Sequence, residues 1–78
     1  MIKKGTIFSL SIDNNPIDYV VVDRLDNMGG GDGGWLCGEK NAVDKNGIEN
    51  ISPFDYWRVT DKYIEAQIQR GVIKIVKN

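Results

Sequence analysis

The sequence predicts a small, mostly β domain (β+α): a five-stranded antiparallel barrel or curled sheet with one short helix. Two observations lead to this expectation. Short segments rich in β-branched and aromatic residues are separated by Gly, Asn, Asp and Pro turn signals. Residues 61–70 alone combine a helix start with apolar residues at helical spacing. The expected order over residues 1–78, a single domain, is β-β-β-β-α-β.

The first two expected strands form a hairpin. Residues 6–12 alternate between apolar and small polar side chains, as in a half-buried strand. Residues 13–16, Asp-Asn-Asn-Pro, have turn chemistry. Residues 17–25 carry three consecutive valines, which indicates burial on both faces and a central place in the sheet. We expect the two strands to pair antiparallel.

A glycine-rich run follows, with five of the nine glycines between positions 29 and 34. Gly29-x-Gly31-x-x-Gly34 matches the dinucleotide-binding pattern, but that pattern works only where it opens a helix. Residues 35–39 look like a third strand instead, and no Lys-Ser/Thr pair completes a P-loop. We therefore expect a mobile loop whose exit is fixed by Trp35.

The second half begins with a further hairpin signal. Asn46-Gly47, within the turn-like residues 44–47, tolerates positive φ and predicts a hairpin turn. Residues 48–51 then form a short fourth strand, residues 52–56 a loop or a single turn, and residues 57–59 a brief extended stretch.

The expected helix starts at Thr60 or Asp61, whose side chains can accept hydrogen bonds from the first turn. Gly71 fits the position just past its end, and residues 72–76 form the last strand. Five short strands with one small helix before the last strand resemble an SH3-like barrel. The resemblance concerns architecture only and implies a binding role by analogy.

Composition excludes several classes of protein. Apolar residues make up 41% and charged residues 27%, as in an ordinary folded domain, and the net charge is −1. The middle of the chain is acidic, with ten acids against four bases over residues 13–61, while both ends are basic. No apolar run approaches the roughly 18 residues that cross a membrane. Because one cysteine cannot form an internal disulfide, we expect a cytoplasmic protein that does not associate with a membrane.

Catalytic and metal chemistry are poorly supported. The chain has no histidine, so the usual general base is missing, and Cys37 has no histidine partner and is expected in the core. The acids around the glycine run lack the spacing of a calcium loop. We expect no enzyme activity, no cofactor and no metal site.

The aromatic residues are the most informative set. A core this small has room for about half of the seven rings. The two readings of the rest are evenly balanced: exposed binding residues, or rings that close the sheet beneath the helix. The candidate partner-binding residues are Trp35, Phe54, Asp55, Tyr56, Trp57, Arg58, Asp26 and Asp32.

These observations favour a non-enzymatic protein-binding module, of the type of small phage or mobile-element regulators and inhibitors. Its exposed aromatics and acidic belt would occlude a partner protein. The alternative is a barrel that binds single-stranded nucleic acid through aromatics, Arg58 and the terminal lysines. The acidic middle disfavours this alternative, because phosphate neutralisation supplies most of such affinity. Self-association through a terminal strand stays open.

Overall fold

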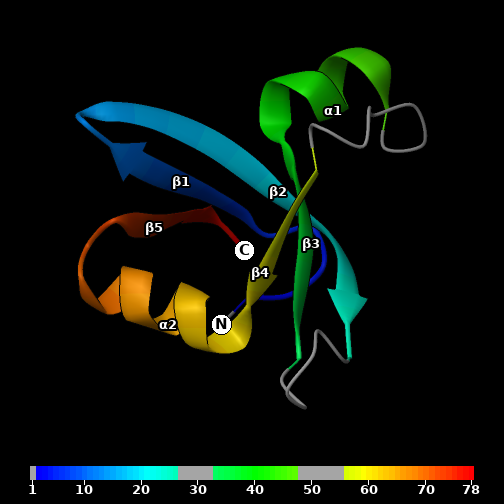
Figure 1. Cartoon of the computed structure of the whole chain (residues 1–78). Helices are drawn as coiled ribbons and strands as arrows, with labels where there is room; N and C mark the ends of the chain where they lie inside the picture. Colours follow the sequence, from blue (N-terminus) through cyan, green and yellow to red (C-terminus); the bar gives the residue numbers. More distant parts are fainter. Residues whose placement is uncertain (1, 27–32, 48–55) are drawn as a thin grey trace.

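A computed structural model describes residues 2–26, 33–47 and 56–78. Within these ranges the chain forms five strands and two short helices (Figure 1): β1 (Ile7–Ile12), β2 (Asn15–Leu25), β3 (Gly34–Glu39), α1 (Lys40–Asn46), β4 (Tyr56–Thr60), α2 (Asp61–Gln69) and β5 (Ile73–Lys77). The strands form one sheet of order β4-β3-β2-β1-β5, and each neighbouring pair is antiparallel. The predicted fold class is confirmed. The sheet is not closed, because β4 and β5 lie at opposite edges.

The first hairpin is confirmed, with a tight turn. Asp13 and Asn14 have φ of 54° and 64°, and Ile12 pairs with Asn15. Two residues with positive φ match the twist of paired strands, and Asn and Asp tolerate this conformation. Pro16 lies inside β2, where a missing N–H is tolerated because β3 pairs with β2 only from Tyr19 onward.

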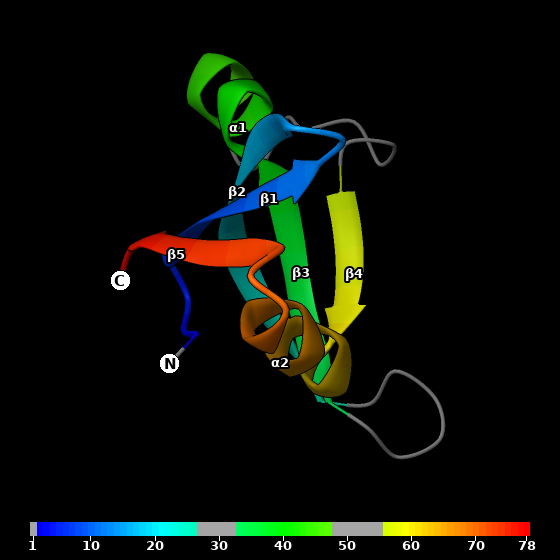
Figure 2. The ribbon, with the colours of Figure 1, turned by 90° about the vertical axis from the view of Figure 1, so that its left-hand side faces the viewer.

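The central strand is β2, as the valine run predicted. β2 pairs with β1 on one side and with β3 on the other. The β2–β3 register shifts between Val21 and Asp23, which marks a bulge. A bulge bends its strand and increases the local twist. The sheet curls accordingly, and α2 packs on one of its faces, which we call the inner face (Figure 2).

The predicted hairpin turn at residues 44–47 is wrong, because α1 occupies Lys40–Asn46. Lys40 and Asp44 form an i,i+4 ion pair at 2.5 Å, a spacing that supports a helix. Gly47 has a φ of 79°, and its N–H donates to the carbonyl of Val43. The positive-φ glycine that suggested a hairpin therefore ends a helix.

On the side away from β2, β3 is bordered by β4. The predicted fourth strand at residues 48–51 lies outside the described residues. Tyr56, assigned to a loop from the sequence, begins β4, and the expected brief extension at residues 57–59 is the middle of this strand. The mobility expected for the glycine loop also falls largely outside the described residues. Gly34 starts β3, which confirms that a strand follows the run.

The helix before the last strand is confirmed. Thr60 is its N-cap, and its side-chain oxygen accepts a hydrogen bond from the N–H of Tyr63 at 3.1 Å. Ile64 is the buried residue of the helix and docks it against the sheet. Gly71, with a φ of 78°, lies just past Arg70 at the helix end. β5 then pairs with β1.

The core lies between the inner face of the sheet and α2. Cys37 is a fully buried member, as predicted. Its buried apolar residues are Phe8, Leu10, Val21, Cys37, Val59, Ile64 and Ile73. None of the described helices is long and apolar enough to cross a bilayer.

The cap of α2 gives a direct stability prediction. Thr60→Ala should lower the free energy of unfolding by about 1 kcal/mol, because it leaves a first-turn N–H without its partner. Thr60→Ser keeps the oxygen and should stay close to wild type. Urea denaturation of the three proteins provides the test. Equal midpoints for the Ala and Ser variants would show that the cap contributes nothing.

Candidate binding surface

Aromatic rings from four elements meet on the inner face. Tyr19 of β2 stacks on Phe8 of β1, with ring centroids 5.6 Å apart. Trp57 of β4 lies 5.2 Å from Tyr19 and meets Tyr63 of α2 edge-on at 5.7 Å. Such tilted and edge-on pairs are favourable beyond their buried area. We call Phe8, Tyr19, Trp57 and Tyr63 the aromatic cluster.

The aromatic cluster borders a hollow of about 470 Å³, which we call the aromatic groove. Phe8 lies beneath the cluster with no exposure, whereas Tyr63 is 41% exposed and Ile12 is 55% exposed. The groove is lined by Leu10, Ile12, Tyr19, Glu39, Tyr56, Trp57 and Tyr63. The groove thus exposes aromatic, aliphatic and polar atoms side by side where α2 leaves the sheet uncovered.

Glu39 is the one charged residue among the described residues that line the aromatic groove. Glu39 and Tyr19 are direct partners in the β2–β3 ladder, so their side chains share the inner face. Burial raises the pKa of the Tyr19 phenol, and the negative charge of Glu39 and the Cys37 thiol raise it further. The phenol therefore stays protonated and can donate a hydrogen bond within the groove.

A second cluster forms where β2, β3 and α2 meet. Arg24 Nη1 donates to Asp61 Oδ1 at 2.7 Å, and Nη2 donates to Oδ2 at 2.9 Å. The same guanidinium lies over the ring of Trp35, 4.6 Å from its centroid. A planar, bidentate guanidinium suits this double contact better than an ammonium would. A hollow of about 450 Å³ adjoins the cluster.

This second cluster is best explained as a clamp that holds α2 on the sheet. Hydrogen bonding from Arg24, its positive charge and a hydrogen bond from Trp35 lower the pKa of Asp61. Gly33, the residue before β3, has no side chain to collide with the Arg24 guanidinium, and a β-carbon there would clash with it. The end of the glycine run therefore makes room for the clamp.

The structure divides the predicted partner-binding residues between these two places. Trp35 belongs to the clamp, and Asp26 is an exposed carboxylate 3.9 Å from Arg24 Nε. Tyr56 and Trp57 line the groove from β4, but they do not form an exposed aromatic loop, since Trp57 packs half-buried on Phe8 and Tyr63. The remaining predicted residues, Asp32, Phe54 and Asp55, lie outside the described ranges.

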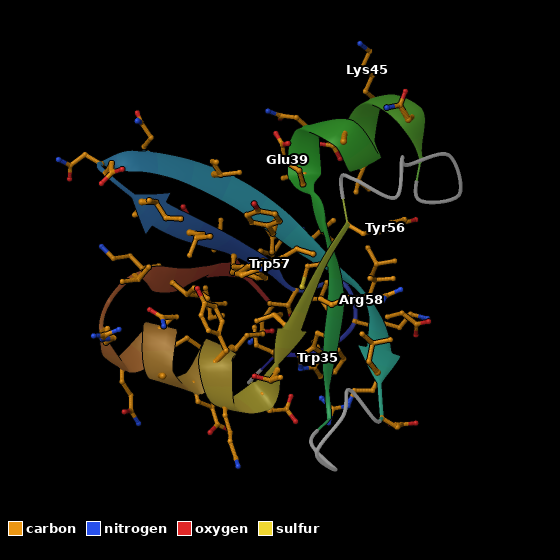
Figure 3. All side chains as sticks on the ribbon, viewed as in Figure 1. Trp35, Glu39, Lys45, Tyr56, Trp57 and Arg58 are labelled. Carbon is orange, nitrogen blue, oxygen red and sulfur yellow. The ribbon has the colours of Figure 1, made fainter. Side chains whose placement is uncertain are left out.

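Arg58 lies on the other side of β4 from Trp57. Figure 3 shows Trp57 turned toward the interior and Tyr56 and Arg58 turned away from it. This follows from the alternation of side chains along a strand. Arg58 is exposed and forms no ion pair with the residues that the structure describes.

Sequence reasoning missed Ile12, Tyr19, Glu39 and Tyr63 as groove residues. Each lies on a different element, and only the strand register brings Tyr19 opposite Glu39. One signal in the sequence could have located part of the groove: the Asp-Asn turn at residues 13–14, which fixes the register of β1 against β2. Nothing in the sequence fixed β3 against β2 as firmly.

Within the described ranges, no group of three or more His, Cys, Asp or Glu side chains is placed to hold a metal ion. The surface instead combines exposed rings, one carboxylate and a strand edge. Comparisons with protein families, with characterised proteins and with solved structures found no significant match.

Cys37 offers a test of the packing beneath the groove. Burial raises the pKa of its thiol to about 12, so almost no thiolate forms near neutral pH. We expect a thiol reagent at about pH 8 to label the native protein far more slowly than the urea-unfolded protein. Quantification by mass spectrometry measures both rates. Equal rates would mean that β3 opens readily.

The clamp predicts a pH dependence. The folded-state pKa of Asp61 lies below its ordinary value of 3.8, so its contribution to stability is present above that value. The contribution is lost as the pH falls through the folded pKa. Asp61→Asn should therefore be less stable than wild type at neutral pH, and the difference should shrink in acid.

Thermal unfolding of both proteins across this pH range measures the difference. Asp26→Asn, which alters a more distant and exposed carboxylate, is the matched control. A stability gap for Asp61→Asn that stays constant down to low pH would exclude the ion pair as its cause.

Proposed function

We propose that this chain is a non-enzymatic protein-binding module that regulates or inhibits its partner by covering part of the partner's surface. The observation that carries the proposal is the aromatic groove. Rings of Tyr19, Trp57 and Tyr63 line a hollow that α2 leaves open, beside the exposed Ile12. Partly exposed Tyr and Trp side chains around a hollow are typical of binding hot spots.

The groove is also preorganised. Phe8 holds Tyr19 from below by stacking, and Tyr63 braces Trp57 edge-on. Rings that are already fixed lose little conformational entropy on binding, so more of the contact energy contributes to affinity. This supports recognition of apolar side chains of a protein.

Exposed acids along the end of β2 add a second element. The side chains of Asp23 and Asp26 are 61% and 96% exposed. These exposed charges lie four and seven residues along the chain from Tyr19, outside the lining of the groove. They favour a partner that extends beyond the groove with basic residues, and they increase the rate of encounter. A small domain with this combination suits the role of a regulator or inhibitor of the phage or mobile-element type, acting in the cytoplasm.

Single-stranded nucleic acid fits the groove less well. Stacking on Tyr19 or Trp57 would suit a base, but none of the residues that line the groove is Lys or Arg, and Glu39 would face the phosphates. Affinity for single strands depends on such basic contacts. We therefore favour a protein partner.

The test is affinity capture from cell lysate with quantitative mass spectrometry, followed by calorimetry on each purified candidate. Ile12→Ser combined with Tyr63→Ala alters two exposed groove residues and leaves the buried core residues unchanged. We expect this variant to bind the partner about tenfold or more weakly, since hot-spot contacts are lost.

Val76→Ser is the matched control, because Val76 is an exposed apolar residue of β5 outside the groove. It should bind like wild type. Equal binding by the wild-type protein and the groove variant, or capture of no protein at all, would contradict the proposal.

A further inference from the structure

We propose that the open edge of β4 receives an extended segment of the partner protein as an additional antiparallel strand. The segment presents an acidic residue opposite Arg58 and apolar residues on both sides of it. This proposal rests on the protein-binding function proposed above and names the form of the partner. It is carried by the hydrogen-bond direction along β4, by the hollow beside this strand and by the charge of Arg58.

The backbone of β4 has hydrogen-bonding groups that face outward. The N–H of Asp61 donates to the carbonyl of Gly33 at 3.1 Å, and β4 pairs with β3 without a register shift from Thr60 to Tyr56. In an antiparallel pair, inward-facing residues alternate with outward-facing ones. Trp57 and Val59 therefore bond to β3, and the N–H and C=O of Arg58 face the edge that no strand of the described residues covers.

β4 is the outermost strand on its side of the sheet, and Figure 2 shows it at the rim with β3 as its one neighbour in the described part. An unpaired edge is a template for another strand. Main-chain hydrogen bonds to such an edge supply affinity, and pockets for alternate side chains supply specificity.

Two hollows adjoin β4. One of about 340 Å³ runs along the strand and is lined by Trp57, Arg58, Val59, Thr60 and Tyr63, and the aromatic groove adjoins it at Trp57 and Tyr63. Residues of an added strand that lie opposite Trp57 and Val59 would direct their side chains to the inner face. Apolar side chains at these positions would contact Trp57, Val59 and Tyr63.

The outer side of β4 favours an acidic residue in the added strand. Arg58 points to the outer face and is exposed without an ion pair in the described part of the chain. The residue directly opposite it in an added strand lies within reach, and an opposite charge at that position is favourable. The recognised segment is therefore apolar–acidic–apolar.

The same charge disfavours a second copy of this chain. Two β4 strands paired antiparallel with full overlap of Tyr56–Thr60 would place both Arg58 guanidinium groups opposite each other. Directly opposed like charges destabilise a strand pair. The acidic segment of a different protein avoids this repulsion.

The experiment selects binders from a displayed library of random peptides against the full chain and measures the enriched peptides by fluorescence anisotropy. We expect an apolar–acidic–apolar motif. Arg58→Glu should weaken these peptides by about tenfold and enrich a basic residue at the central position instead. Arg58→Pro removes the outward N–H, which an edge strand tolerates, and should weaken every motif peptide by at least about tenfold.

Hydrogen exchange supplies a readout that side-chain contacts alone would not produce. The Arg58 amide should become protected when an enriched peptide is added, while the amides of Trp57 and Val59 should be protected already in the free protein. If Arg58→Pro fails to fold by circular dichroism, the Arg58→Glu specificity and the exchange data decide the question.

Two results would overturn the inference and leave the protein-binding function standing. In the first, the enriched peptides bind the Ile12→Ser/Tyr63→Ala variant more weakly, but they do not protect the Arg58 amide of the wild-type protein. That result would mean that peptides bind in the groove without adding a strand. The second is a captured protein partner together with no enriched motif. A concentration-dependent dimer that Arg58→Pro abolishes would also overturn it, in favour of a second copy.

Discussion

The fold depends on how one nine-residue helix covers the inner face of a five-stranded sheet. A helix of this length is too short to stand alone and too small to cover every strand, so it must be fixed by packing. Ile64 supplies the buried contact at the α2 end of the core. At the other end, side chains of the strands themselves cover the core, because Tyr19 stacks on Phe8 and Trp57 packs against both rings. The proposed binding surface is thus the part of the core that the helix does not reach.

This arrangement explains why α2 needs its polar attachments. Thr60 caps the first turn, and Asp61, the next residue, holds Arg24 in a two-point contact. Each contact is at least partly exposed and individually weak, since solvent screens ion pairs of this kind. Together they fix where α2 starts, immediately after β4. The angle between α2 and β4 then sets the edge-on contact of Tyr63 with Trp57, and through it the shape of the groove.

The sequence predicted what local chemistry decides. The Asp13-Asn14 turn, the central valine-rich strand, the Thr60 cap and the Gly71 stop are each specified by adjacent residues, and each is present. Asn46-Gly47 was misinterpreted because positive φ serves a hairpin turn and a helix end equally well. Long-range register decided the rest, since nothing near Glu39 in the sequence indicates Tyr19 as its neighbour. The groove could therefore be predicted only as a surplus of aromatics, without its members.

The two edges of this open sheet are not equivalent, and the difference follows from the residues beside them. β5 carries two lysines in five residues, a device that discourages further pairing, and its first residue, Ile73, is buried in the core. β4 carries one cation, Arg58, between Trp57 and Val59, which turn toward the core on the inner face. A single cation does not prevent every strand from pairing with an edge. It disfavours only strands that carry a cation opposite Arg58. In the proposed complex, the same residue that opposes self-pairing is a selective contact for an acidic segment, and the aromatic cluster that completes the core provides aromatic surface beside it.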